Sequence, residues 1–116
     1  MSVCEKINSR AIQSTKNILQ ALKKMDEVKV KMLLVFKGKQ FLSILTIGDI
    51  QRAIIKGVNM TEPITSILQT KKKFASPEET IEQVRQKMLS LRAECMPVVD
   101  IDGNLDNVYF WNELFN

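Results

Sequence analysis

The chain alternates between segments with helical and with strand-like hydrophobic spacing. A helix is predicted over residues 15–26, where four apolar positions fall on one face at i, i+3, i+4 and i+7: Ile18, Ala21, Leu22 and Met25. The apolar run at 32–36 predicts a strand, and residues 41–46 predict its hairpin partner across the turn formers at 37–40. A second helix is expected over 48–56, because Gly57 stands where a helix C-terminal glycine belongs.

The same order of elements returns in the second half. Ser76-Pro77-Glu78-Glu79 is typical of a helix start, with Ser76 as N-cap, proline at the first helical position and an acid three residues after the cap. The apolar face of this helix is predicted to hold Ile81, Val84, Met88 and Leu91. Strands are expected over 96–99 and 105–110 around an Asp-Gly turn, and a helix begins at 111–115.

A nearly constant offset connects the two halves. Ile18, Ala21 and Met25 align with Ile81, Val84 and Met88 at a separation of 63 residues. Leu34-Val35 aligns with Val98-Val99, and Thr46 and Asp49 align with Phe110 and Glu113, at a separation of 64, so one extra residue lies in the loop between helix and strand. Two unrelated helix–hairpin–helix segments can look alike, but an offset that holds across three elements favours an internal duplication.

Composition narrows the classes of function. The 116 residues, 45% of them hydrophobic and 26% charged, are typical of one globular domain. The sequence has no histidine, which excludes Ser-His-Asp and Cys-His nucleophiles and histidine metal sites. Its two cysteines, Cys4 and Cys95, do not form a zinc motif, and Cys95 is expected to be a small core residue. Neither a secretory leader nor an apolar stretch of about 20 residues is found, so a cytoplasmic protein without membrane attachment is expected.

The positive charge invites a nucleic-acid interpretation, which the pattern does not favour. The net charge is +4 and the isoelectric point is near 9.2. The lysines are scattered, however, and no aromatic residues interleave with them as a stacking platform requires. The one basic run, Lys71–Lys73, is expected to be a solvated connector rather than a phosphate patch.

Two motifs resemble the CBS domain, the family named after cystathionine β-synthase. Residues 41–50 are similar to the family's strand ending in Thr-x-x-Asp, and Met96-Pro97-Val98-Val99-Asp100 is similar to its Pro-Val-Val-Asp strand. The resemblance implies a mixed α/β (α+β) fold of two pseudo-symmetric β-α-β-β-α motifs packed through their small sheets. The motifs would be residues 1–58 and 59–116, with first strands near 11–13 and 73–75.

A narrower resemblance concerns residues 47–57 and 108–115. Both segments are similar to CBS pairs that precede sugar-phosphate nucleotidyltransferase domains. This implies that the chain is the N-terminal regulatory part of a longer enzyme, with a catalytic domain attached after Asn116. The 116 residues themselves contain no catalytic constellation, so this chain is not expected to be an enzyme.

Thr46 and Asp49 are the strongest candidates for ligand binding. In CBS domains this Thr-x-x-Asp pair binds the sugar of an adenine nucleotide, so the resemblance implies AMP, ADP or ATP as regulatory ligand, without a cofactor or metal. A carboxylate accepts both hydroxyls of a ribose, and the free N–H groups at the start of a helix favour a phosphate. The same two residues are also typical of a capping box, and the two roles are compatible.

The second half departs from this motif. Phe110 replaces the threonine and cannot accept a hydrogen bond, and Glu113 is one methylene longer than aspartate. We therefore expect a degenerate second site and at most one nucleotide per pair. The resemblance places the base near five residues: Ile12, Gln13, Met32, Met96 and Pro97. For the two methionines, core filling is the favoured interpretation.

Three functions follow in order of preference. The first is a regulatory module in which an adenine nucleotide controls an attached domain. The second is a structural dimerisation module, since CBS pairs commonly stack as homodimers. Non-specific nucleic-acid binding comes last.

Overall fold

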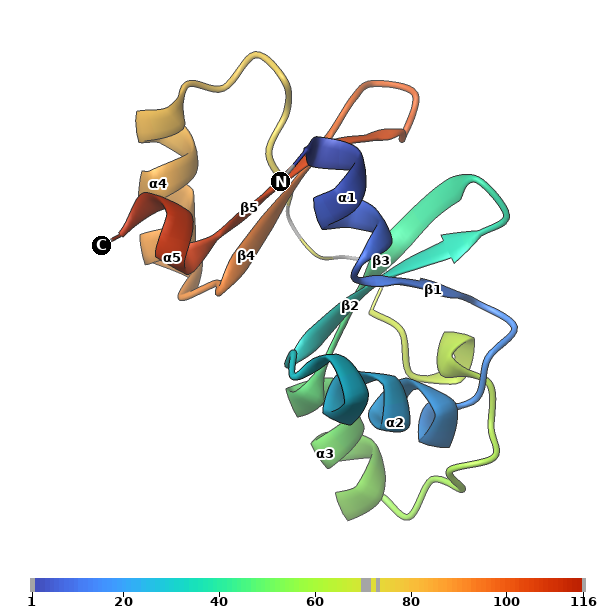
Figure 1. Cartoon of the computed structure of the whole chain (residues 1–116). Coiled ribbons are helices and arrows are strands. Elements are labelled where there is room, and N and C mark those ends of the chain that lie inside the picture. The colour runs from blue at the N-terminus through green and yellow to red at the C-terminus, as the bar shows by residue number, and fades with distance from the viewer. Residues whose placement is uncertain (1, 70–71, 73, 116) are drawn as a thin grey trace. The chain divides into compact units, whose positions relative to one another are not determined.

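The computed structural model describes residues 2–69, 72 and 74–115, which form two compact units. The larger unit is Ile7–Lys72, and the smaller unit is Met1–Lys6 with Lys73–Asn116. Figure 1 labels the elements, whose bounds are α1 Val3–Asn8, β1 Ala11–Gln13, α2 Ile18–Val28, β2 Met32–Lys37, β3 Gln40–Thr46, α3 Ile47–Ile55, η1 Ile64–Ser66, α4 Ile81–Leu91, β4 Cys95–Val99, β5 Leu105–Phe110 and α5 Trp111–Leu114.

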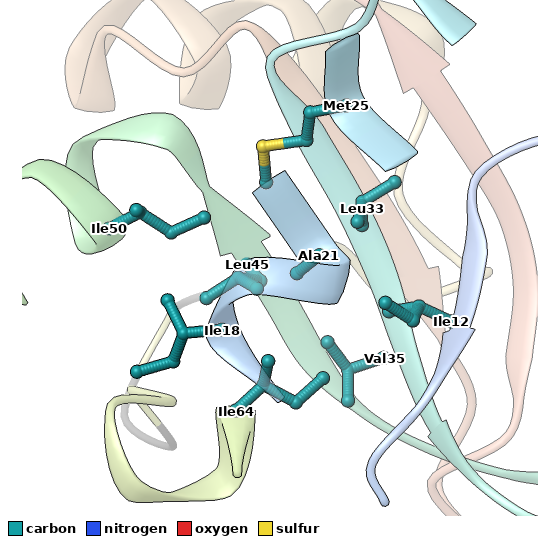
Figure 2. Packing of buried hydrophobic residues seen from close by; sticks show 9 residues of the cluster. All are labelled: Ile12, Ile18, Ala21, Met25, Leu33, Val35, Leu45, Ile50 and Ile64. Atoms are coloured by element: carbon teal, nitrogen blue, oxygen red, sulfur yellow. The ribbon is translucent and has the colours of Figure 1, made fainter. Parts of the chain in front are cut away.

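The larger unit is built on a three-stranded sheet in the order β1-β2-β3. The hairpin β2–β3 is antiparallel, whereas β1 pairs in parallel with β2 because α2 carries the chain back between them. One face of the sheet is covered by α2, α3 and η1. Figure 2 shows the resulting core, which consists of Ile12, Ile18, Ala21, Met25, Leu33, Val35, Leu45, Ile50 and Ile64. The apolar face predicted for α2 is therefore the face that is buried.

The smaller unit repeats this plan with shorter strands and a shorter last helix. Its hairpin β4–β5 is antiparallel, and Ala75 forms a parallel bridge with Val98 where the larger unit has β1. Of the first strand predicted at 73–75, Lys73 lies outside the described residues. The core of the unit consists of Ala75, Val84, Met88, Met96 and Val98. Cys95 is buried at the start of β4, as its apolar surroundings predict.

Details of geometry are duplicated as well. Helices α2 and α4 have 11 residues each and end on left-handed residues, Lys29 at φ 59° and Arg92 at φ 53°. Both hairpins carry an irregularity, after Val35 in one and after Val98 in the other. The predicted mixed α/β fold with small sheets is confirmed.

The division of the sequence at residue 58 is not the division between the compact units. Residues 59–69 belong to the larger unit, because Ile64 is buried in its core and the Ser43 hydroxyl donates to the carbonyl of Gln69 at 2.8 Å. A repeat boundary in the sequence and a boundary between packed units are different properties. The motif bounds 1–58 and 59–116 thus stay a prediction.

The predicted start of α4 is wrong by one turn. The helix begins at Ile81 with Thr80 as N-cap, and the Thr80 hydroxyl accepts from the Gln83 N–H at 3.1 Å. Ser76 instead heads a separate turn, in which its N–H donates to the Glu79 carboxylate at 2.6 Å. The bridge between Ala75 and Val98 holds the chain extended just before this turn, so the helix begins at the second capping signal.

Candidate functional site

The candidate site lies where β3 ends and α3 begins, and its first two residues form a complete capping box. The Thr46 N–H donates to Asp49 Oδ2 at 2.9 Å, and the Asp49 N–H donates to Thr46 Oγ1 at 3.2 Å. Each residue thereby satisfies a backbone group that the first turn of a helix leaves unpaired. The capping role predicted for this pair is confirmed, whereas ligand binding by the pair stays a prediction.

Two cations complete the surroundings of Asp49. Arg52 donates to Oδ1 at 2.7 Å, and the Lys72 ammonium lies 2.9 Å from Oδ2. Lys72 also donates to the carbonyl of Ile44 at 3.1 Å. We call Thr46, Asp49, Arg52 and Lys72 the carboxylate corner. The Asp49 side chain is only 1% exposed there, so its charge is balanced inside the corner rather than by water.

The electrostatics of the corner favour the ionised aspartate. Burial raises the pKa of Asp49, but the Thr46 N–H, the Lys72 ammonium and Arg52 together outweigh burial, and the net pKa lies below the ordinary value. The carboxylate is therefore an anion at neutral pH. An anionic carboxylate can only accept hydrogen bonds, so the corner is suited to ligands that present hydroxyl or N–H donors.

Gly48 lies beside the corner in the first turn of α3. A Cβ at this position would lie 3.4 Å from a guanidinium nitrogen of Arg52 and 3.6 Å from Thr46 Oγ1, which are ordinary contact distances. Because α3 has 9 residues and begins here, the positive end of its dipole lies at the same place.

The residues predicted for the base occupy different places in the larger unit. Met32 is buried and pairs in register with Thr46, so it borders the corner. The Ile12 side chain belongs to the core, and the Gln13 amide is held by Gly38, whose N–H donates to Gln13 Oε1 at 2.9 Å. Ile12 and Gln13 also line a shallow pocket of about 370 Å³, together with Ala11, Lys16, Gln20 and Lys24.

The other two predicted base residues lie in the smaller unit. Met96 is buried in that unit's core, which agrees with the favoured core-filling interpretation. Pro97 is fully buried on β4, and its carbonyl accepts from the Ala75 N–H at 3.0 Å. A role of either residue toward a base remains a prediction.

The equivalent corner of the smaller unit lacks the hydroxyl. The Phe110 N–H donates to Glu113 Oε1 at 2.9 Å. This bond is one half of a capping box, and it does not need a side-chain acceptor at position 110. Lys6 pairs with Glu113 at 3.1 Å and lies 5.6 Å from the centre of the Tyr109 ring. The Lys6 side chain is 14% exposed and that of Glu113 is 37% exposed, so water reaches the carboxylate of this corner, unlike that of Asp49.

Sequence reasoning missed the two cations of the carboxylate corner. Arg52 follows Asp49 by one helical turn, and this i, i+3 spacing is a signal that could have identified it. Lys72 had no such signal, because it is 23 residues away and reaches Asp49 only through the tertiary fold. Lys72 belongs to the basic run that was expected to be a solvated connector, and for Lys72 this expectation is wrong, because its side chain is only 17% exposed and pairs with Asp49. Lys71 and Lys73 lie outside the described residues.

Comparison with known proteins finds a family-model match over part of the sequence. Residues 55–108 match the family model described as the CBS domain. No curated protein matches the chain in sequence. No helix in the described part of the chain has the length and hydropathy needed to cross a membrane.

Solved structures extend the likeness over nearly the whole chain. A CBS domain protein from Pyrobaculum aerophilum, complexed with AMP, is 17% identical with a TM-score of 0.76 over 90% of this chain and 82% of that one. A CBS domain pair complexed with 5′-methylthioadenosine and S-adenosyl-L-methionine is 20% identical, with a TM-score of 0.73 over 90% and 82%. OpuCA of Staphylococcus aureus is 20% identical, with a TM-score of 0.70 over 90% and 86%. The resemblance to a CBS domain pair is thus confirmed for the fold.

Proposed function

We propose that this chain, whose fold is that of a CBS domain pair, is a regulatory module that binds one adenine nucleotide at the carboxylate corner. The observation that carries the proposal is Asp49. An ionised, buried carboxylate stands at the start of a helix, beside a threonine hydroxyl and Gly48. Such a group suits the two neighbouring hydroxyls of a ribose, and the helix N-terminus suits a phosphate.

The ligands of similar structures support an adenosine compound. The protein from Pyrobaculum aerophilum holds AMP, and the pair described above holds 5′-methylthioadenosine and S-adenosyl-L-methionine. These three ligands share an adenosine and differ at the 5′ position. We therefore propose an adenosine-containing ligand whose ribose is held by Asp49 and Thr46. For Ile12, Gln13, Met32, Met96 and Pro97 we propose contact with the base.

Calorimetric titration with AMP, ADP and ATP tests this function. One nucleotide per chain is expected, because the Phe110–Glu113 corner lacks a hydroxyl acceptor. Asp49→Ala should abolish the binding heat, and Glu113→Ala should leave it unchanged. Absence of heat up to millimolar concentrations of all three nucleotides would remove the nucleotide from the proposal.

We further propose that the module controls an attached catalytic domain of the sugar-phosphate nucleotidyltransferase class, in the cytoplasm. The support is the similarity of residues 47–57 and 108–115 to CBS pairs that precede such domains. A nucleotide can act on an attached domain only if it binds two arrangements of the module with different affinity. Sequencing the gene beyond the codon of Asn116 tests this step, because a glycine-rich nucleotide-binding segment should follow.

Self-association is a second candidate function, favoured by one surface. Ile55 is 83% exposed and Ile54 is 54% exposed, side by side at the end of α3. Large apolar side chains that are exposed together can mark a site of protein association. A homodimer formed through this face should dissociate on dilution in analytical ultracentrifugation, and a monomer at every concentration would exclude it.

A further inference from the structure

Lys72 occupies a position that a ligand of Asp49 would need. Its ammonium lies 2.9 Å from Asp49 Oδ2 and 3.1 Å from the carbonyl oxygen of Ile44, and only 17% of its side chain is exposed. A carboxylate offers about four lone-pair positions. In this structure Oδ2 accepts from the Thr46 N–H and Lys72, and Oδ1 accepts from Arg52.

Two ribose hydroxyls cannot be added without a loss among these donors. The Thr46 N–H belongs to the capping box and is fixed by the start of α3. Arg52 fills only one of the two positions on Oδ1, so one ribose hydroxyl can bind beside it. Both positions on Oδ2 are filled by the Thr46 N–H and Lys72, so the second hydroxyl can bind Oδ2 only if Lys72 moves.

This inference rests on the proposed function. We propose that Lys72 competes with the ligand for the Asp49 carboxylate, so that the corner binds phosphorylated nucleosides more tightly than nucleosides. A nucleoside that displaces the ammonium leaves it without an anionic partner. A nucleotide offers the ammonium its phosphate in exchange for the Asp49 carboxylate, so the ion pair is replaced rather than lost.

The smaller unit supplies a matched control. Lys87 binds a carbonyl and a carboxylate in the same manner, at 3.3 Å from the Phe74 oxygen and 2.8 Å from a Glu79 oxygen. Lys87→Met removes an equivalent lysine from a place where no ligand is proposed. Lys72→Arg keeps a positive charge at the corner, whereas Lys72→Met removes the charge and keeps an apolar stem of similar length.

The experiment measures dissociation constants for adenosine and AMP with the wild-type chain and these three variants. The wild type, Lys72→Arg and Lys87→Met should each prefer AMP by roughly tenfold or more, as expected for one charge-assisted hydrogen bond. Lys72→Met should bind adenosine more tightly than the wild type and lose most of the preference for AMP. Circular dichroism of each variant confirms that it is folded.

Two results would overturn the inference, and they are distinguishable. If Lys72→Met keeps the AMP preference of the wild type, Lys72 does not select the phosphate, although nucleotide binding itself stands. If neither the wild type nor any variant binds AMP or adenosine, the proposed function fails and the inference falls with it.

Discussion

The carboxylate corner and the Phe110–Glu113 corner occupy equivalent positions in the two units, but they solve the same local problem differently. At both, an acid three residues after the strand end accepts from the N-cap amide, at 2.9 Å in each case. The Thr46 hydroxyl completes the box in the larger unit, and Phe110 offers no acceptor in the smaller one. The Asp49 side chain is buried and accepts from three donors, whereas Glu113 remains partly exposed.

At both corners, a lysine from a segment distant in the sequence pairs with the acid. Lys72 pairs with Asp49 at 2.9 Å, and Lys6 pairs with Glu113 at 3.1 Å. The lysine–acid pair is therefore shared and does not by itself mark a ligand site. The two corners differ in the Thr46 hydroxyl, in the extra methylene of Glu113 and in the burial of the acid.

The largest expected effect is on AMP affinity, which should depend on Asp49 and not on Glu113. Asp49→Asn replaces one acceptor oxygen with a donor, so it can no longer receive both ribose hydroxyls, and AMP affinity should fall at least about tenfold. Glu113→Gln makes the same change in the smaller unit and should leave affinity unchanged. Calorimetry on both variants checks this, and equal losses of affinity would erase the distinction between the corners.

The next largest effect is on the free energy of unfolding, which should depend more on the lysine paired with Asp49 than on the lysine paired with Glu113. Lys72→Met removes a partner of a buried carboxylate and should lower the free energy of unfolding at pH 7 by about 1–3 kcal/mol. Lys6→Met, at the more exposed pair, should lower it by less than about 1 kcal/mol. Urea unfolding measures both, and a loss as large in Lys6→Met as in Lys72→Met would contradict the difference in burial.

The pH dependence of the Lys72→Met effect has a defined sign. The folded pKa of Asp49 lies below its ordinary value, so the stabilisation is present at neutral pH and is lost as the pH falls through that folded pKa. The difference between the wild type and Lys72→Met should therefore shrink in acid, below about pH 4. A difference that stays constant from pH 7 to pH 3 would show that the loss is not electrostatic.

A smaller effect distinguishes capping from binding. Thr46→Ala removes the side-chain acceptor of its box and should cost about 1 kcal/mol, and Thr80→Ala should cost a similar amount at the start of α4. Only Thr46→Ala should also weaken AMP binding. Thermal unfolding paired with calorimetry checks this, and identical AMP affinities in the two variants would leave Thr46 with a capping role alone.

The smallest expected effect on folding concerns the exposed end of α3. Ile55→Asp changes a side chain that is 83% exposed, so the free energy of unfolding should change by less than about 0.5 kcal/mol. If this face associates with a second copy, the same substitution should shift the sedimentation coefficient from dimer to monomer. A dimer that persists unchanged in Ile55→Asp would exclude this surface as the interface.

Local patterns predicted most of the fold. Alternation and turn residues located both hairpins, and the face formed by Ile18, Ala21 and Met25 is the buried face of α2. The start of α4 was misplaced because Ser76 and Thr80 both look like caps, and the choice depends on the pairing of Ala75 with distant Val98. Helix α1 was not predicted, since its six residues include no buried side chain and so carry no hydrophobic period.

The candidate site was predictable only in part, for a similar reason. Thr46 and Asp49 are close in sequence, and their capping box follows from local geometry. Lys72, which closes the corner, is brought to Asp49 by the path of the chain around the larger unit. No pattern in one sequence reports a contact between a loop lysine and a helix start 23 residues away.

The most direct test of the difference between the two corners is one titration of the isotope-labelled chain with AMP, followed by amide NMR. We expect saturable shifts at Thr46, Gly48, Asp49 and Lys72, fitting one site per chain, while the signals of Phe110 and Glu113 stay near their free positions. Shifts centred on Phe110 and Glu113, or no shifts at millimolar AMP, would contradict it.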